Sequence, residues 1–297
     1  MRYGLLDFLW VHRGASASAR VMDTVGLMRQ AEALGFDRYW VGEHHLPGYA
    51  AASPEVLIAA GLQQTQRIRL GSGAVLLGYR DTLRVALDYR ALTAFADRVD
   101  LGIGRGRADR QANHDLLSGR LPAWGDGLMP LEPYREQAIQ LTKLLGNGLP
   151  GVTVLPEDAP RPQLWVCGSG QAASLAAEIG AAFCYTLFHP GQKSPDVIKR
   201  YREEFHARHS NRSPLSALAV AGSVTPDEQH ARQLREAHRY MAYSPDIVGP
   251  ISQAADQLNA LAKIYAPDDL IWMDIEVRVE HRLVAMDRLA QVIRTLS

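Results

Sequence analysis

The chain has 297 residues, of which 47% are hydrophobic and 22% are charged, with 32 Lys and Arg against 32 Asp and Glu. This composition is typical of a soluble globular protein and argues against a disordered chain. A formal net charge of zero gives no sign of the basic face that binds nucleic acid or anionic lipid. We therefore expect a small-molecule ligand.

The sequence gives no sign of export or of membrane insertion. It contains no run of ~18 uninterrupted apolar residues, and Asp7 interrupts the apolar run near the N-terminus. We expect a cytoplasmic protein that neither crosses nor binds a membrane. Cys167 and Cys184 each lie in an apolar run, and in a reducing compartment we expect them to be buried free thiols.

Short runs rich in β-forming residues alternate with longer segments of helical period along the whole chain. This alternation predicts βα units around a parallel sheet, and eight units suit a closed ring of strands. We therefore expect an α/β fold, a (β/α)8 TIM barrel formed by residues 1–297 as a single domain. The expected strands are 3–8, 38–41, 68–76, 99–103, 163–167, 182–188, 215–223 and 270–277.

The helices between these strands are marked by apolar spacing and by capping residues. Gly35 is a C-terminal stop, whereas Asp81 or Thr82 and the Pro226-Asp227 pair are typical of helix starts. The expected helices are 21–34, 82–96, 134–145, 171–179, 228–241, 252–264 and 280–296.

Two longer connections interrupt this alternation of strands and helices, at 106–131 and at 146–161. Barrel enzymes place catalytic loops after their strands, so we assign function only to the first loop, which follows strand four. Its glycines, charged residues and Trp124 predict a lid that covers a pocket. The second loop precedes a strand and is expected on the opposite, stabilising face.

An open doubly wound sheet that binds a dinucleotide is the alternative architecture. It requires Gly-x-Gly-x-x-Gly after the first strand, where this chain has Trp10-Val11-His12-Arg13-Gly14. A later glycine cluster has Arg107 at the position of the final glycine. The dinucleotide-binding fold is therefore disfavoured.

Polar and glycine-rich motifs follow or end the predicted strands, so a barrel would gather them at one mouth. The motifs, in chain order, are Glu43-His44-His45, Gly71-Ser72-Gly73-Ala74, Gly102-Ile103-Gly104-Arg105-Gly106, Cys167-Gly168-Ser169-Gly170 and Phe188-His189. Their combination and order resemble the luciferase-like flavin-dependent monooxygenases. The similarity extends from Tyr3-Gly4-Leu5-Leu6-Asp7 to Glu280-His281-Arg282-Leu283.

Glu43 and His44 are the candidate catalytic residues. A metal site is disfavoured because adjacent histidines on an extended segment point to opposite faces. A hydrogen-bonded structural pair remains an alternative. The resemblance implies that His44 faces the flavin and takes part in proton transfer, for which a pKa near neutrality is suited.

A phosphate site is expected where Gly168, Ser169 and Gly170 begin a helix, because helix N-terminal amides bind anions. An ordinary serine N-cap is the alternative at this position. Arg105 would supply a cation, although its flanking glycines could simply permit a tight loop. The resemblance places both elements on the phosphate of FMN.

Three further residues are assigned to cofactor binding. Gly73 and Ala74 are similar to the family's non-proline cis peptide behind the flavin ring, and the alternative is a strand with small residues. His189 follows strand six, where it would line the pocket wall, and a surface histidine is the alternative.

The resemblance implies an oxidoreductase that uses FMN, reduced by a separate flavin reductase, and dioxygen as co-substrate. A flavin C4a-peroxide would then oxygenate a small organic substrate, and a homodimer is expected. Two alternatives remain open: a deazaflavin-dependent hydride-transfer oxidoreductase, and a non-catalytic flavin-binding member of the family.

Overall fold

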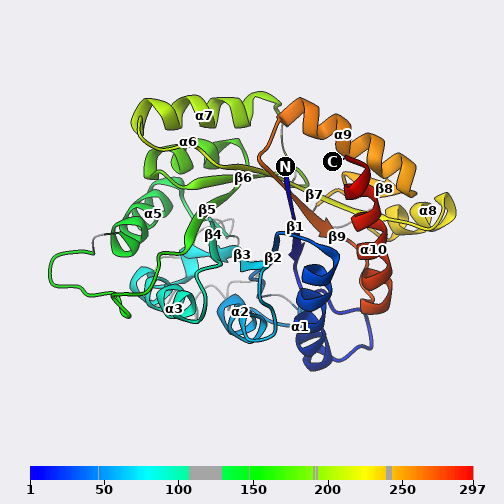
Figure 1. The fold of residues 1–297 in the computed structure, drawn as a ribbon, viewed down its shortest axis with the longest axis horizontal. Helices are drawn as coiled ribbons and strands as arrows, with labels where there is room; N and C mark the ends of the chain where they lie inside the picture. The colour runs from blue at the N-terminus through cyan, green and yellow to red at the C-terminus, as the bar shows by residue number, and fades with distance from the viewer. Residues whose placement is uncertain are drawn as a thin grey trace.

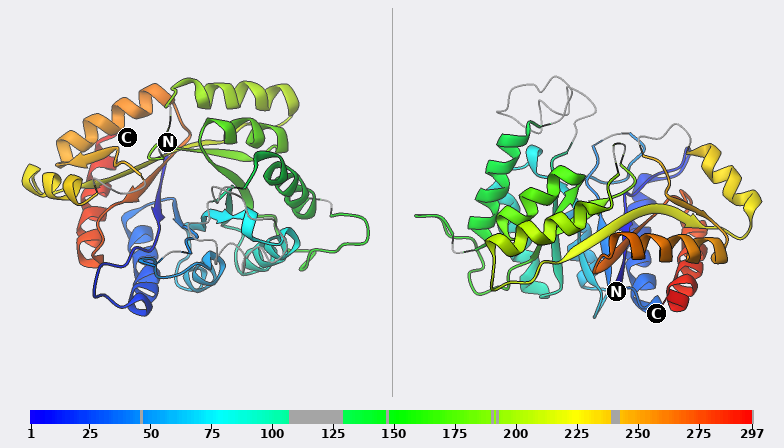
Figure 2. Two further views of the ribbon diagram at one scale, coloured as in Figure 1. Left: turned by 180° about the vertical axis from the view of Figure 1, so that it is seen from behind. Right: turned by 90° about the horizontal axis from the view of Figure 1, so that it is seen from above.

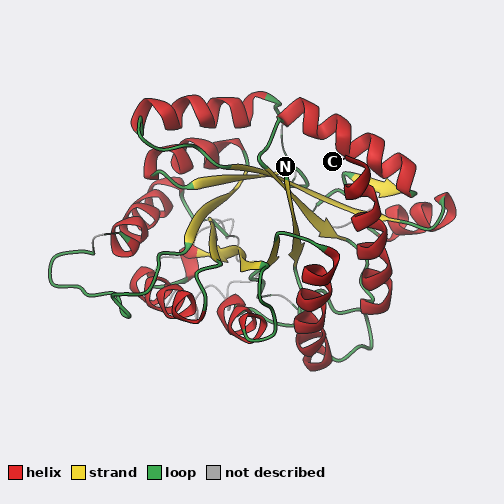
Figure 3. Ribbon diagram, viewed as in Figure 1, coloured by secondary structure: helices red, strands yellow, loops and turns green. Residues whose placement is uncertain are grey.

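A ring of parallel strands surrounded by helices organises the chain in the computed structural model (Figures 1 and 3). The structure describes residues 1–45, 47–106, 129–146, 148–189, 191, 193–238 and 243–296. The strands are β1 (Arg2–Asp7), β2 (Arg38–Val41), β3 (Arg69–Leu76), β4 (Val99–Gly104), β5 (Gln163–Gly168), β6 (Ala182–Thr186), β7 (Ser216–Val224), β8 (Ile247–Gly249) and β9 (Asp269–Asp274).

Eight of these strands close a barrel, so the predicted (β/α)8 TIM barrel is confirmed. Strands β1 to β7 pair in chain order, β7 pairs with β9, and β9 pairs with β1. The short strand β8 pairs with the end of β7 outside this ring. The sequence analysis did not identify β8, and it extended the sixth and ninth strands by two and three residues beyond Thr186 and Asp274.

The helices lie around the outside of the barrel, which the view from behind shows as well (Figure 2). Helices α2 and α7 were not identified in the sequence, whereas the other helices overlap the predicted ranges. They are α1 (Ala17–Leu34), α2 (Pro54–Leu62), α3 (Thr82–Phe95), α5 (Leu131–Leu145), α6 (Gly170–Ile179), α7 (Asp196–Arg208), α8 (Glu228–Ala237), α9 (Ile251–Tyr265) and α10 (Val279–Leu296), with a 3-10 turn η1 (Leu77–Tyr79).

Local capping explains why several helices begin and end where they do. The Asp81 carboxylate accepts a hydrogen bond from the Arg84 amide at 2.9 Å, and the Asp227 carboxylate accepts one from the His230 amide at 2.8 Å. Gly35 ends α1 in the left-handed conformation at φ 89°. These three capping predictions are confirmed.

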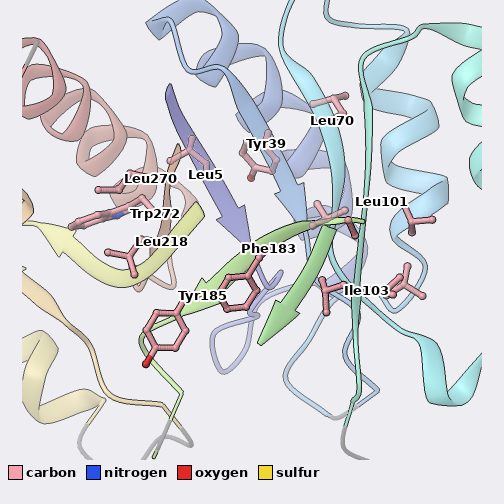
Figure 4. Packing of buried hydrophobic residues seen from close by; sticks show 14 of the residues in the cluster. Leu5, Tyr39, Leu70, Leu101, Ile103, Phe183, Tyr185, Leu218, Leu270 and Trp272 are labelled. Atoms are coloured by element: carbon pink, nitrogen blue, oxygen red, sulfur yellow. The ribbon is translucent and has the colours of Figure 1, made fainter. Parts of the chain in front are cut away.

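Two buried clusters follow from the alternation of side chains along the strands. The larger cluster joins strand residues such as Leu5, Tyr39 and Leu101 to the surrounding helices (Figure 4). The smaller one consists largely of the alternate strand residues, such as Leu6 and Trp40, and fills the barrel interior. The barrel is therefore a packed core, and a ligand site must lie at one of its ends.

An ionic network fills the end of the barrel where the strands begin. The Arg38 guanidinium lies between the Asp100 and Asp269 carboxylates, at 2.5 and 2.7 Å, and 4.9 Å from the Trp165 ring. A Cβ on Gly4 would lie 2.9 Å from the Arg38 Cγ, so glycine leaves room for this arginine. This end is closed by paired charges.

Helix α10 packs beside α1 and thus joins the two ends of the chain. Arg282 of α10 and Arg20 of α1 both donate to the buried Asp7 carboxylate, and the Arg20 contact measures 2.5 Å. The two arginines hold the pKa of Asp7 well below its usual range, although burial alone would raise it.

Among the described residues, no helix is both long and apolar enough to cross a membrane.

Candidate functional site

The carboxyl ends of the strands form the mouth of the barrel, and the predicted site residues lie there. Ile103 pairs with Val166 in β4 and β5, so the segment after β4 runs beside the end of β5. Gly168 pairs with Tyr185 of β6 in the same direction. The barrel therefore brings the motifs after β4, β5 and β6 to adjacent positions.

Arg105 directly follows β4 and is half-buried. Its guanidinium forms no hydrogen bond or ion pair with any residue that the structure describes. Most buried arginines of this chain, such as Arg38 and Arg282, are paired with carboxylates. A partly buried cation without a counter-charge is suited to an anionic ligand.

The N-terminus of α6 lies at the end of β5. Ser169 is the N-cap residue, but its side chain accepts no hydrogen bond from the helix, so it does not form an ordinary serine cap. The first amides of an α-helix have no acceptor within the helix, and the helix dipole favours a negative charge there. Gly168 adopts φ +157° immediately before this turn. The helix start can therefore bind an anion.

Tyr134, in the first turn of α5, is a site residue that the sequence analysis treated only as part of a helix. Its ring is 3% exposed, and its hydroxyl is buried with no hydrogen-bond partner among the described residues. Burial raises the pKa of this phenol, while the nearby Arg105 cation opposes that shift. The Tyr134 hydroxyl is therefore a second polar group, besides Arg105, that has no partner among the described residues.

Glu43 follows β2 and is buried at 1% exposure. One carboxylate oxygen bonds with Arg80 Nε at 3.0 Å and with His45 Nε2 at 2.7 Å, and the other accepts from the Leu76 amide at 3.0 Å. These contacts tie β2 to the loop after β3. The Glu43 carboxylate therefore holds the backbone that carries His44.

His44 lies on the opposite side of the extended segment, as expected for adjacent residues. Its ring stacks on Tyr49 with centroids 4.3 Å apart, and contacts the edge of Phe8 at 4.4 Å. Burial, followed by the neighbouring His45 and His189, lowers the pKa of His44 to about 4. The imidazole is thus neutral at physiological pH, and its pKa lies below the near-neutral value that the sequence analysis associated with proton transfer.

The Gly73–Ala74 peptide bond is cis, the conformation that the family resemblance implied. The Ala74 carbonyl accepts a hydrogen bond from the Glu43 amide at 3.3 Å. A Cβ on Gly104 would lie 3.3 Å from the Ala74 Cβ. The small residues of β3 and β4 therefore allow close approach at the mouth, next to His44 and Arg105.

His189 lies in the turn after β6 and is exposed, with its Nδ1 2.8 Å from the Thr186 hydroxyl. The structure places it at the mouth but shows no contact that assigns it to a cofactor. The predicted lid falls mainly on residues 107–128, which lie outside the described residues. Both assignments stay predictions.

The two cysteines are free thiols on paired positions of β5 and β6. Cys184 is buried as predicted, whereas Cys167 is only half-buried because it lies close to the mouth. No group of three or more His, Cys, Asp or Glu side chains within the described ranges is arranged to hold a metal ion.

Comparisons with known proteins identify relatives of this chain. Residues 1–126 match the family of luciferase-like monooxygenases. The uncharacterized protein YwcH of Bacillus subtilis is 30% identical over 94% of this chain and 95% of its own length. The N-acetyl-S-alkylcysteine monooxygenase of the same organism is 31% identical over 70% of this chain and 62% of its own length.

Solved structures share the whole fold. The apo-MsnO8 structure superposes with a TM-score of 0.87 at 26% identity and covers 99% of this chain and 98% of that one. Two more distant structures match in fold, with TM-scores of 0.75 and 0.71 at 18% and 17% identity. Each match covers all of this chain, and 98% and 99% of the other. They are the FMN complex of the oxygenating constituent of 3,6-diketocamphane monooxygenase of Pseudomonas putida, and an F420-dependent secondary alcohol dehydrogenase. Since the matches span the barrel and the residues at its mouth, the chain belongs to the luciferase-like monooxygenase family of oxidoreductases.

Proposed function

We propose that this protein is an FMN-dependent monooxygenase that uses dioxygen to oxygenate a small organic substrate. The observation that carries the proposal is a set of groups at the mouth that have no partner among the described residues: the Arg105 guanidinium, the Tyr134 hydroxyl and the N-terminus of α6. A dianionic phosphate would satisfy all three. We define these three elements as the anion site.

The residues around the anion site fit the remainder of FMN. The cis Gly73–Ala74 peptide and Gly104 offer backbone and little side chain, which suits a flat ring system lying against the strand ends. When bound, reduced FMN supplies the electrons that activate dioxygen, and a separate reductase is proposed to supply the reduced form. The chain itself must bind the cofactor, orient the substrate and exclude water.

His44 is the proposed proton-transfer residue. A ring with a pKa of about 4 is neutral at pH 7, so its single N–H can donate to a reacting group, while its other nitrogen is only a weak base. Glu43 is proposed to act as a positioning residue, because its carboxylate is fully engaged with Arg80, His45 and the Leu76 amide. The homodimer and the cytoplasmic location stay predictions.

The test is an anaerobic titration of the chain with reduced FMN and, separately, with a reduced deazaflavin, followed by mixing with dioxygen. We expect reduced FMN to bind and to be reoxidised at a rate different from that of free FMN. Preferential binding of the deazaflavin with no change on exposure to oxygen would instead establish hydride transfer, and binding of neither would contradict both activities.

A further inference from the structure

Aromatic side chains continue the barrel interior beyond the end of β1. Phe8 and Trp10 follow Leu6 at alternate positions, so they belong to the same interior cluster. The Trp10 ring stacks on Tyr243 at 5.2 Å and 12°, and Phe8 meets the edge of Phe188 at 6.1 Å. Together with His44, these four rings form what we call the ring wall of the mouth.

The ring wall contains the buried indole N–H of Trp10. Trp10 is 5% exposed, and its indole N–H is buried with no acceptor among the described residues. The N–H of Trp165 also has no partner among the described residues, but that ring meets Trp40 edge to face and covers Arg38 deeper in the barrel. Within the ring wall, Trp10 supplies this donor, whereas Arg105 and Tyr134 belong to the anion site.

Two neighbouring hydroxyl groups are already paired with histidines. The Tyr243 hydroxyl lies 3.1 Å from His238 Nδ1, and the Thr186 hydroxyl lies 2.8 Å from His189. The ring wall itself carries no carboxylate, ammonium or guanidinium group. A charged substrate placed against it would lose its hydration without gaining a counter-charge, whereas a neutral ring would only bury apolar surface.

We propose that the ring wall binds an uncharged, ring-shaped substrate whose oxygen accepts a hydrogen bond from the Trp10 indole N–H. This inference rests on the proposed function, because it places the substrate at the same mouth as the cofactor. It goes further by naming the substrate class and the residue that selects it. The donor would be matched by an acceptor such as a ketone oxygen, so a hydrocarbon of the same shape should bind less tightly.

The probes are three two-ring compounds of similar size. We would measure binding of 1-tetralone, tetralin and 1-naphthoate to the full chain by calorimetry, with and without FMN. We expect 1-tetralone to bind about tenfold more tightly than tetralin, as one buried hydrogen bond allows. With FMN present to fill the anion site, we expect 1-naphthoate to bind most weakly, because its carboxylate has no partner at the ring wall.

The discriminating variant is Trp10→Phe, which keeps a ring but removes the donor. We expect it to bind tetralin almost as the unmodified chain does and to lose the preference for 1-tetralone. The matched control is Trp272→Phe, an equivalent change in a buried residue of β9 that packs in the outer cluster, and the preference should persist there.

Equal or tighter binding of 1-naphthoate, no binding of any probe, or an intact ketone preference in Trp10→Phe would overturn the inference. The same samples titrated with FMN separate this outcome from failure of the proposed function. Binding of FMN without the ketone preference would reject the ring-wall assignment alone, whereas the ketone preference without FMN binding would reject the cofactor assignment alone.

Discussion

The two ends of the barrel differ in whether their buried polar groups are paired with other residues. At the base, the Arg38 guanidinium is matched by Asp100 and Asp269, which also pair with Arg69 and Arg2 at 2.8 and 2.7 Å. At the mouth, the Arg105 guanidinium and the Tyr134 hydroxyl have no partner among the described residues. Removing one partner of the matched charges would leave a buried charge uncompensated, whereas polar groups without a described partner are available to a ligand.

The largest expected effect follows from removing the central cation of the ionic network at the base of the barrel. Arg38→Ala would leave the Asp100 and Asp269 carboxylates buried without their shared cation, and the loss should be about 3–5 kcal/mol of the free energy of unfolding. Urea denaturation measures it. The matched control is Arg105→Ala, which should change this free energy by less than about 0.5 kcal/mol because no charge among the described residues loses its partner. Similar losses in both variants would show that the two ends do not differ.

The second prediction concerns cofactor affinity at the mouth. Arg105→Ala should weaken FMN binding by about 1–3 kcal/mol, the range for loss of a charge-assisted hydrogen bond. A flavin-fluorescence titration measures this change. Arg84→Ala, at an exposed arginine of α3, is the control and should bind FMN normally. Unchanged affinity in Arg105→Ala would remove this residue from the anion site.

Tyr134→Phe sharpens the comparison, because stability and affinity should change in opposite directions. Removing an unsatisfied buried hydroxyl should leave the fold as stable or more stable, while FMN affinity falls by about 0.5–1.5 kcal/mol. The control is Tyr201→Phe, where the buried hydroxyl donates to the Ala181 carbonyl at 2.8 Å. That variant should lose about 1 kcal/mol of stability and keep its FMN affinity. The opposite pattern would place the Tyr134 hydroxyl in the fold and not in the site.

The smallest expected effect is the pH dependence contributed by His44. Its pKa of about 4 in the folded chain lies below the unfolded value of about 6.5, so the unfolded state binds more protons at acidic pH. The stability that this group contributes is present above pH 6.5 and is lost as the pH falls toward 4. Between pH 7 and pH 6, His44→Phe should lose about 0.7 kcal/mol less than the unmodified chain. His206→Gln, at an exposed position of α7, should show no such difference, and an identical effect in both variants would contradict a buried neutral His44.

Most of the fold could be predicted because parallel strands and their covering helices have distinct periods. The exceptions have physical reasons. Helix α2, PEVLIAAGL, is apolar on most of its surface and so shows no amphipathic period. Strand β8 has three residues and exists only through its pairing with β7, which no local pattern indicates.

The candidate site was predicted only in part. Arg105 and Ser169 could be identified because they follow strands, where barrels place their functional groups. Tyr134 was missed because it lies on a helix and resembles a core aromatic, although its position in the first turn after the strand-four loop was an available signal. The pairing of Arg38 with Asp100 spans 62 residues and that of Asp7 with Arg282 spans 275, distances over which one sequence carries no pairing signal.

The central claim is that the unsatisfied groups at the mouth bind the phosphate of FMN. The most direct measurement is the ratio of the dissociation constants of riboflavin and FMN for the unmodified chain, because the two ligands differ only in that phosphate. The account predicts that FMN binds at least about tenfold more tightly, and that raising the salt concentration reduces this preference. Equal affinity for riboflavin and FMN would contradict it.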